Sequence, residues 1–172
     1  IDADEITSLP GWEGALPTRQ WSGYLEGPAT DAATNRTCRA FVHYWLVENA
    51  AGRADAPTVV WQQGGPGGSS LIGLLTENGP LTLNDFSFAT DAYNATGVPT
   101  VFENAASWHR APANVLYVEH PAPTGFSYCL AAGANDTAVE CAWDDTTQAA
   151  AALAFYVAFF AEVRGVPSLS LS

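Results

Sequence analysis

The sequence predicts an α/β fold in which helices cross over a mixed β-sheet. Residues 58–62 and 115–119 are short runs of β-branched and aromatic residues typical of strands, and residues 145–164 form a long apolar run typical of a helix. Strands and helices that follow one another in this way favour crossover connections within one sheet. At 172 residues and 48% apolar content, the chain has the size and composition of one folded domain.

The first two predicted strands are residues 20–26 and 40–48, which a polar turn joins. Both alternating sets of side chains in the second strand are largely apolar, which indicates that the sheet is covered on both faces there. One face holds His43, Trp45 and Val47, and the other holds Val42, Tyr44 and Leu46.

The third predicted strand, residues 58–62, breaks into four glycines and a proline and resumes as a predicted helix at residues 71–75. Glycine allows close approach to the backbone, so the exposed N–H groups of such a turn can bind an anion or an oxyanion. A plain tight loop is the alternative. A phosphate-binding loop is excluded, because the chain has no lysine and Ser70 stands where a third glycine would follow Gly65 and Gly67.

The second half of the chain adds a predicted strand, a helix and a further strand. Residues 81–112 are expected to be irregular, and the strand at 115–119 ends at a segment rich in proline and glycine. Asp144 or Asp145 is a good N-cap for a helix that runs to Arg164. Because this helix is apolar nearly all round, we expect it to be buried against the sheet. Residues 168–172 are expected to start a fifth strand.

Charge and composition exclude several classes of function. The net charge is −12, and six arginines without a basic patch make nucleic acid a poor partner. The most apolar stretch, residues 146–161, is too short to span a membrane. The spacing of Cys and His matches no metal site, and no cofactor is predicted.

Three N-x-T sequons and three cysteines suggest a protein of the secretory pathway. The sequons, expected in loops, are at Asn35, Asn94 and Asn135. Cys129 and Cys141 flank a loop rich in Gly and Asn, and we expect a disulfide between them. Cys38 is then left over, either as a buried thiol or with a partner outside this chain.

The glycine-rich segment W-Q-Q-G-G-P-G-G-S-S, residues 61–70, resembles W-L-N-G-G-P-G-C-S-S of the serine carboxypeptidases, which are α/β-hydrolases. Three more segments resemble family motifs in the same order: H-Y-W-L-V-E at 43–48, E-N-G-P at 77–80, and N-V-L-Y-V-E-H-P at 114–121 followed by G-F-S-Y at 125–128. The resemblance implies an incomplete α/β-hydrolase fold, with the N-terminal strands and first crossover helices of a mixed sheet. Residues 1–172 are then expected to be the N-terminal part of a single domain that ends just before the nucleophile elbow.

The resemblance also implies a Ser-His-Asp triad and an acyl-enzyme mechanism. The family places its serine in G-E-S-Y-A-G, which this chain lacks, so we expect the triad to lie beyond it and the chain alone to be inactive. By resemblance, the backbone N–H of Gly65 is one oxyanion donor. Gln63, Gly64 and Glu77 correspond to the positions that bind the terminal carboxylate of a peptide substrate. In the family this glutamate pairs with an acidic residue beside the nucleophile, and a proton shared there favours action in acid.

Ser127 lies in G-F-S-Y-C, a near match to the G-x-S-x-G nucleophile motif. A hydrolase of this fold takes its histidine base from after the serine, whereas His43, His109 and His120 all precede Ser127. We therefore expect Ser127 to be structural. His120, where the family has Gln, is expected to be a packing residue.

Other departures affect specificity more than fold. Gln63 replaces Asn, Gly68 replaces a cysteine, and Pro123 replaces a glycine of the family pattern. The sequence favours a serine carboxypeptidase of the secretory pathway, extracellular or vacuolar/lysosomal. The alternatives are an acyltransferase on the same scaffold and, in another class, an inactive fragment or binding module.

Overall fold

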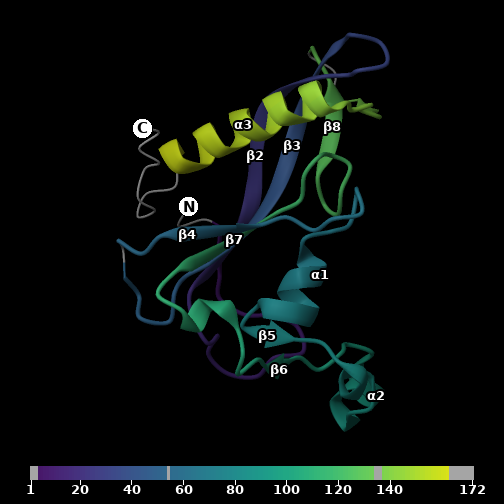
Figure 1. The fold of residues 1–172 in the computed structure, drawn as a ribbon. Coiled ribbons are helices and arrows are strands. Elements are labelled where there is room, and N and C mark those ends of the chain that lie inside the picture. The colour runs from purple at the N-terminus through teal and green to yellow at the C-terminus, as the bar shows by residue number, and fades with distance from the viewer. Residues whose placement is uncertain (1–3, 54, 134–136, 163–172) are drawn as a thin grey trace.

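The computed structural model describes residues 4–53, 55–133 and 137–162, whose main feature is one mixed β-sheet (Figure 1). The strand order is β1 (Glu5–Ile6), β2 (Gln20–Thr30), β3 (Thr37–Val47), β7 (Asn114–Val118) and β4 (Thr58–Trp61). β7 is antiparallel to β3 and parallel to β4. At the other end of β3, β8 (Tyr128–Ala131) pairs with it and with β9 (Ala138–Val139). The mixed sheet confirms the predicted α/β class.

β2 and β3 form a long antiparallel hairpin that runs from the pair Gln20–Val47 to the pair Thr30–Thr37. Both strands extend further toward the turn than the sequence predicted. Along β3, residues of both alternating sets are buried, including Val42, His43 and Val47. The prediction that this strand is covered on both faces is therefore confirmed.

One face of the sheet is covered by α3 (Asp145–Glu162), which packs along β2 (Figure 1). Asp144 caps it, because its Oδ1 accepts a 2.7 Å hydrogen bond from the Thr147 N–H. Phe159 is fully buried and packs edge-on against Tyr44, with ring centroids 5.2 Å apart.

The expectation that this helix is buried against the sheet holds for one side of α3. Leu153 and Val157 are 60% and 58% exposed, because only one side of the helix contacts the sheet within the described residues. The predicted helix end at Arg164 and the predicted strand at 168–172 lie outside the described residues. In the described part of the chain, no helix combines the length and apolar character needed to cross a membrane.

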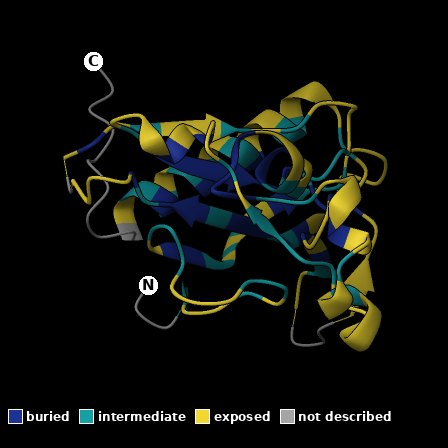
Figure 2. Cartoon of the chain, turned by 90° about the horizontal axis from the view of Figure 1, so that it is seen from below, coloured by how far each residue is buried: buried dark blue, intermediate teal, exposed yellow. Residues whose placement is uncertain are grey.

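The opposite face of the sheet packs against a short helical segment, α1 (Leu71–Gly73), which continues as the π-helical turn η2 (Leu74–Asn78). Leu74 shares a buried cluster with Val47, Val115 and Tyr117. The sheet thus lies between helices, and Figure 2 shows the buried residues along its strands with exposed residues on the outer helices and loops.

Residues 81–112 are more ordered than the irregular segment that the sequence predicted. They contain β5 (Leu81–Thr82), η3 (Asp85–Phe88), α2 (Asp91–Thr96), β6 (Phe102–Glu103) and η4 (Trp108–Arg110). Local side-chain caps define these short elements: Asn84 and Ser87 form a capping box, and Thr90 accepts a hydrogen bond from the Tyr93 N–H. Asn94, expected in a loop, is exposed within α2, whereas Asn35 is exposed outside helices and strands. Asn135 lies outside the described residues.

Candidate active site

The glycine loop, residues 62–70, connects β4 to α1 at the edge of the sheet where the parallel strands β4 and β7 both end. Its backbone takes conformations that favour glycine at Gly65 (φ 139°) and Gly67 (φ 91°). A Cβ atom on Gly68 would lie 2.6 Å from the Gly64 carbonyl oxygen, so the turn is too tight for a side chain there. The conformation of this turn therefore favours glycine at positions 65, 67 and 68.

The loop presents N–H groups that a ligand can use. Gly64, Gly65 and Gly67 are exposed, and no acceptor for their N–H groups is present in residues 4–53, 55–133 or 137–162. The Gly68 N–H is used internally and donates to the Gly64 carbonyl oxygen at 3.2 Å. Fixed backbone donors of this kind can stabilise a carboxylate or a developing oxyanion.

The side chain of Gln63 is oriented by Trp61, two residues earlier in the chain. The indole N–H of Trp61 donates a 3.1 Å hydrogen bond to Gln63 Oε1. Since the amide oxygen already accepts a hydrogen bond, the two N–H donors of the amide remain for a hydrogen-bond acceptor such as a carboxylate. Gly73 makes room for the indole, because a Cβ atom there would lie 2.3 Å from Trp61 Nε1.

Glu77 lies in η2, the helical turn that follows the loop and α1, and it is exposed. Its backbone carbonyl accepts a hydrogen bond from Asn104 Nδ2 at 3.1 Å, which fixes the end of the turn. The next residue, Asn78, is buried and accepts a 2.6 Å hydrogen bond from the Tyr117 hydroxyl. Burial raises the pKa of Tyr117 strongly, so this hydroxyl remains a donor.

A buried carboxylate that no sequence motif singles out lies beneath the loop. Glu119 directly follows β7 and is fully buried. Its carboxylate accepts hydrogen bonds from Ser69 Oγ, from the Phe126 N–H at 2.8 Å and from His43 Nδ1 at 3.0 Å. The sequence signal that could have indicated Glu119 is an acidic residue directly after an apolar strand.

The glycine loop and the residues around it lie inside a match to a known protein family. The sequence profile of the serine carboxypeptidase family matches residues 10–168. The chain belongs to this family.

Curated serine carboxypeptidase relatives align with most of this chain, but the chain spans only about a quarter of their length. The lysosomal protective protein of Mus musculus is 42% identical over 127 residues, which are 74% of this chain and 22% of the relative. Serine carboxypeptidase-like 19 of Arabidopsis thaliana is 39% identical over 124 residues, which are 72% of this chain and 23% of the relative. Among solved structures, a prohormone-processing carboxypeptidase from Saccharomyces cerevisiae matches with a TM-score of 0.43 and 25% identity, over 63% of this chain and 20% of that one.

Ser127 has no free hydroxyl in this serine carboxypeptidase chain. It is 3% exposed, its Oγ donates to the Glu119 carbonyl oxygen at 2.5 Å, and it accepts from the His43 N–H at 2.8 Å. These contacts agree with the structural role that we expected.

His120 is buried beside Trp143, and burial lowers its pKa to about 4. Burial also lowers the pKa of His109, with a further contribution from the positive charge of Arg110.

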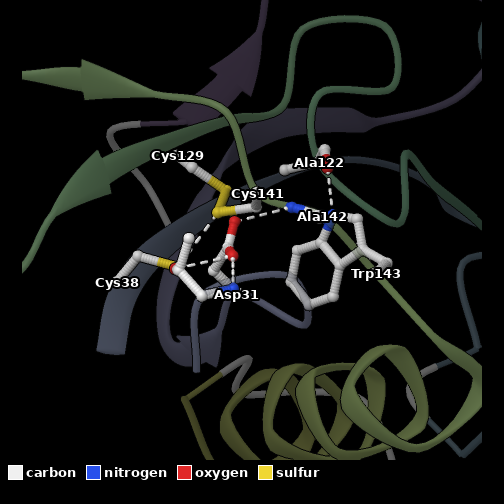
Figure 3. The surroundings of a disulfide bond; sticks show 8 residues. Asp31, Cys38, Ala122, Cys129, Cys141, Ala142 and Trp143 are labelled. Carbon is white, nitrogen blue, oxygen red and sulfur yellow. Dashed lines mark hydrogen bonds between the residues drawn. A yellow bond between two sulfur atoms is a disulfide. The ribbon is translucent and has the colours of Figure 1, made fainter. Parts of the chain in front are cut away.

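The three cysteines gather at the β3–β8 end of the sheet (Figure 3). A disulfide joins Cys129 and Cys141, whose Cα atoms are 6.3 Å apart. Cys38 is a buried free thiol, with its Sγ 3.0 Å from that of Cys141. Burial raises the pKa of the Cys38 thiol, and the nearby Asp31 carboxylate raises it further. The disulfide uses two of the three sulfurs, so this cluster is not a set of three metal-binding thiolates.

Proposed function

We propose that the complete protein is a serine-type carboxypeptidase that hydrolyses C-terminal residues from peptides through a Ser-His-Asp triad outside this chain. The observation that carries the proposal is the glycine loop at the edge where β4 and β7 end. Its exposed N–H groups have no acceptor within the described residues, and family membership gives them a chemical role.

In this mechanism the Gly65 N–H donates to the oxygen that becomes negatively charged when the serine attacks the scissile carbonyl. Gly65 has a φ of 139°, a conformation that favours glycine, and a backbone donor that is oriented before the reaction needs little reorganisation as charge develops. Loss of one such donor typically lowers the rate by about 10²–10³. A second donor is expected beside the serine.

The terminal carboxylate of the substrate is held by the Gln63 amide, the Gly64 N–H and Glu77. The Trp61 indole N–H engages Gln63 Oε1, which leaves the donors of this amide for the carboxylate. Two carboxylates in contact are stable only when they share a proton, so binding beside Glu77 favours acidic conditions.

An acidic compartment of the secretory pathway fits this chemistry. One relative is named a lysosomal protective protein, and Asn35 and Asn94 are exposed sequon residues. We therefore propose a glycosylated protein that is extracellular or resides in a vacuole or lysosome.

The test compares a blocked dipeptide with its C-terminal amide, using the full-length protein and kcat/KM measured against pH. Glu77→Gln should change the pH dependence for the dipeptide and spare the amide, which has no carboxylate. The exposed Glu13 provides a matched control, and Glu13→Gln should affect neither substrate. Gln63→Asn should retain or improve activity, since it restores the family residue.

Equal slowing of both substrates by Glu77→Gln at every pH would assign Glu77 a structural role. Acyl transfer to an added alcohol without hydrolysis would instead identify an acyltransferase. A full-length protein that cleaves neither peptides nor esters would contradict the proposal.

A further inference from the structure

We propose that Glu119 is a positioning residue that holds the glycine loop in its oxyanion-binding conformation through the hydroxyl of Ser69. The inference rests on the proposed function of the loop. It assigns the buried carboxylate a part in the reaction without contact with the substrate.

The side chain of Ser69 links Glu119 to the loop. Ser69 Oγ donates to Glu119 Oε1 and accepts a 3.2 Å hydrogen bond from the Leu71 N–H, the first residue of α1. Ser69 thus ties the end of the glycine loop and the start of the helix to one fixed oxygen atom. A fixed loop end restricts the directions of the preceding N–H groups, on which electrostatic stabilisation depends.

The carboxylate is itself fixed by the turn that follows β7. The Phe126 N–H donates to Glu119 Oε2 at 2.8 Å. Gly125 has a φ of 54°, and a Cβ atom there would lie 1.8 Å from Glu119 Oε1. The turn therefore closes directly over the carboxylate, and any side chain at residue 125 would displace it.

The Glu119 carboxylate is also held from the neighbouring strands β3 and β2. His43 on β3 lies 3.0 Å from Glu119 Oε2 through Nδ1, and 2.8 Å from Ser22 Oγ on β2 through Nε2. Burial raises the pKa of Glu119, but hydrogen bonds from His43, Ser69 and the Phe126 N–H outweigh it and leave the pKa below its usual value. Glu119 therefore remains a charged acceptor at a site without solvent, where charge-assisted hydrogen bonds are strong.

The series Ser22–His43–Glu119 has the order of a nucleophile, a base and an acid. Its surroundings argue for positioning instead. His43 is 6% exposed, and its ring contacts those of Tyr24 and Phe126 at centroid distances of 5.2 and 5.4 Å. The imidazole that would act as the base and the Glu119 carboxylate are both buried, which favours a positioning role.

The experiment uses the full-length protein with Ser69→Ala, which removes the donor and keeps every glycine. We expect kcat for a blocked dipeptide to fall about 10–100-fold with KM within about twofold, because small misplacements of catalytic groups cost up to about 10²-fold. Ser69→Thr keeps the hydroxyl and should restore most of the activity. The matched control is Ser87→Ala, which removes another buried serine in η3 and should leave kcat unchanged.

Hydrogen exchange gives a readout that does not need activity. In Ser69→Ala, the amides of Gln63 and Gly68, which are hydrogen-bonded inside the loop, should exchange faster than in wild type or Ser87→Ala. An inactive wild type would contradict the proposed function, whereas faster exchange would still support the positioning role. Unchanged exchange of both amides in Ser69→Ala, or a loss of activity confined to KM, would overturn the inference.

Discussion

The hydroxyl of Ser70 donates a 2.6 Å hydrogen bond to the carbonyl oxygen of Val118, the last residue of β7. The same hydroxyl accepts a 3.1 Å hydrogen bond from the Gln63 N–H, so one buried atom joins both ends of the glycine loop to the sheet. The position of the loop is thereby set by the strand beside β4.

Ser70→Ala should lower the free energy of unfolding by about 1–3 kcal/mol, because the buried Val118 carbonyl and the Gln63 N–H both lose their partner. The measurement is urea denaturation of the full-length protein. Thr76→Ala is the control, since Thr76 is exposed and its hydroxyl donates to the Ile72 carbonyl of its own helical segment. Equal effects of the two substitutions would contradict the anchoring role of Ser70.

Phe159→Ala should destabilise the protein by about 3–5 kcal/mol, the range for removal of a buried aromatic ring. Phe159 is fully buried between α3 and Tyr44. Leu153 on the same helix is 60% exposed, so Leu153→Ala should change stability by no more than about 0.5 kcal/mol. Thermal and denaturant unfolding check both values, and a costly Leu153→Ala would show that a further part of the protein covers this face.

Cys129→Ser should redirect the disulfide. Since Cys38 Sγ lies 3.0 Å from Cys141 Sγ, these two residues should pair once Cys129 is absent. Peptide mapping under non-reducing conditions, on protein expressed through the secretory pathway, should find the fragment that joins Cys38 and Cys141. Cys38→Ser should leave the Cys129–Cys141 disulfide intact. Two free thiols in Cys129→Ser would show that the buried Cys38 side chain cannot reach the required geometry.

His120→Gln should flatten the dependence of stability on pH. Burial lowers the folded-state pKa of His120 from 6.5 to about 4, so the unfolded chain binds the proton more tightly. The contribution of this histidine to stability is complete above pH 6.5 and falls as the pH drops toward 4, by about 3 kcal/mol in total. His120→Gln removes the ionisable group and restores the family residue.

The measurement for His120 is the free energy of unfolding of wild type and variant at several pH values between 7 and 5. This range lies above the titration of most carboxylates. Some slope should remain in the variant, because His109 also has a lowered pKa. Identical slopes in the two proteins would mean that His120 is not the group responsible.

The central strands were predictable because short β-branched runs are bounded by proline or glycine. The structure places them within one residue of the expected bounds, at Thr58–Trp61 and Asn114–Val118. The outer half of the β2–β3 hairpin was missed, since residues 27–30 contain Gly and Pro and are strand only because β3 pairs with them. Neighbouring strands, rather than local pattern, decided that part of the fold.

The candidate site also has a part that the sequence predicts and a part that it does not. The glycine loop was predictable because its residues are contiguous and their motif resembles that of a known family. The contacts among Ser22, His43 and Glu119 join β2, β3 and the residue that follows β7. The order of these strands follows from tertiary pairing, and no local spacing reveals the contacts. Similarly, the exposed side of α3 depends on what lies next to it, which an apolar helical sequence does not specify.

The position of β7 between β3 and β4 also constrains the order of folding. The β2–β3 hairpin is local and can form early. The sheet closes only when β7 is present, because Tyr44 of β3 pairs with Val118 and Val60 of β4 pairs with Leu116. During synthesis, the inner edge of β3 and the facing edge of β4 therefore stay unpaired until the chain has emerged beyond residue 118. Open strand edges pair readily with other chains, so this interval is when the nascent protein most needs protection from aggregation.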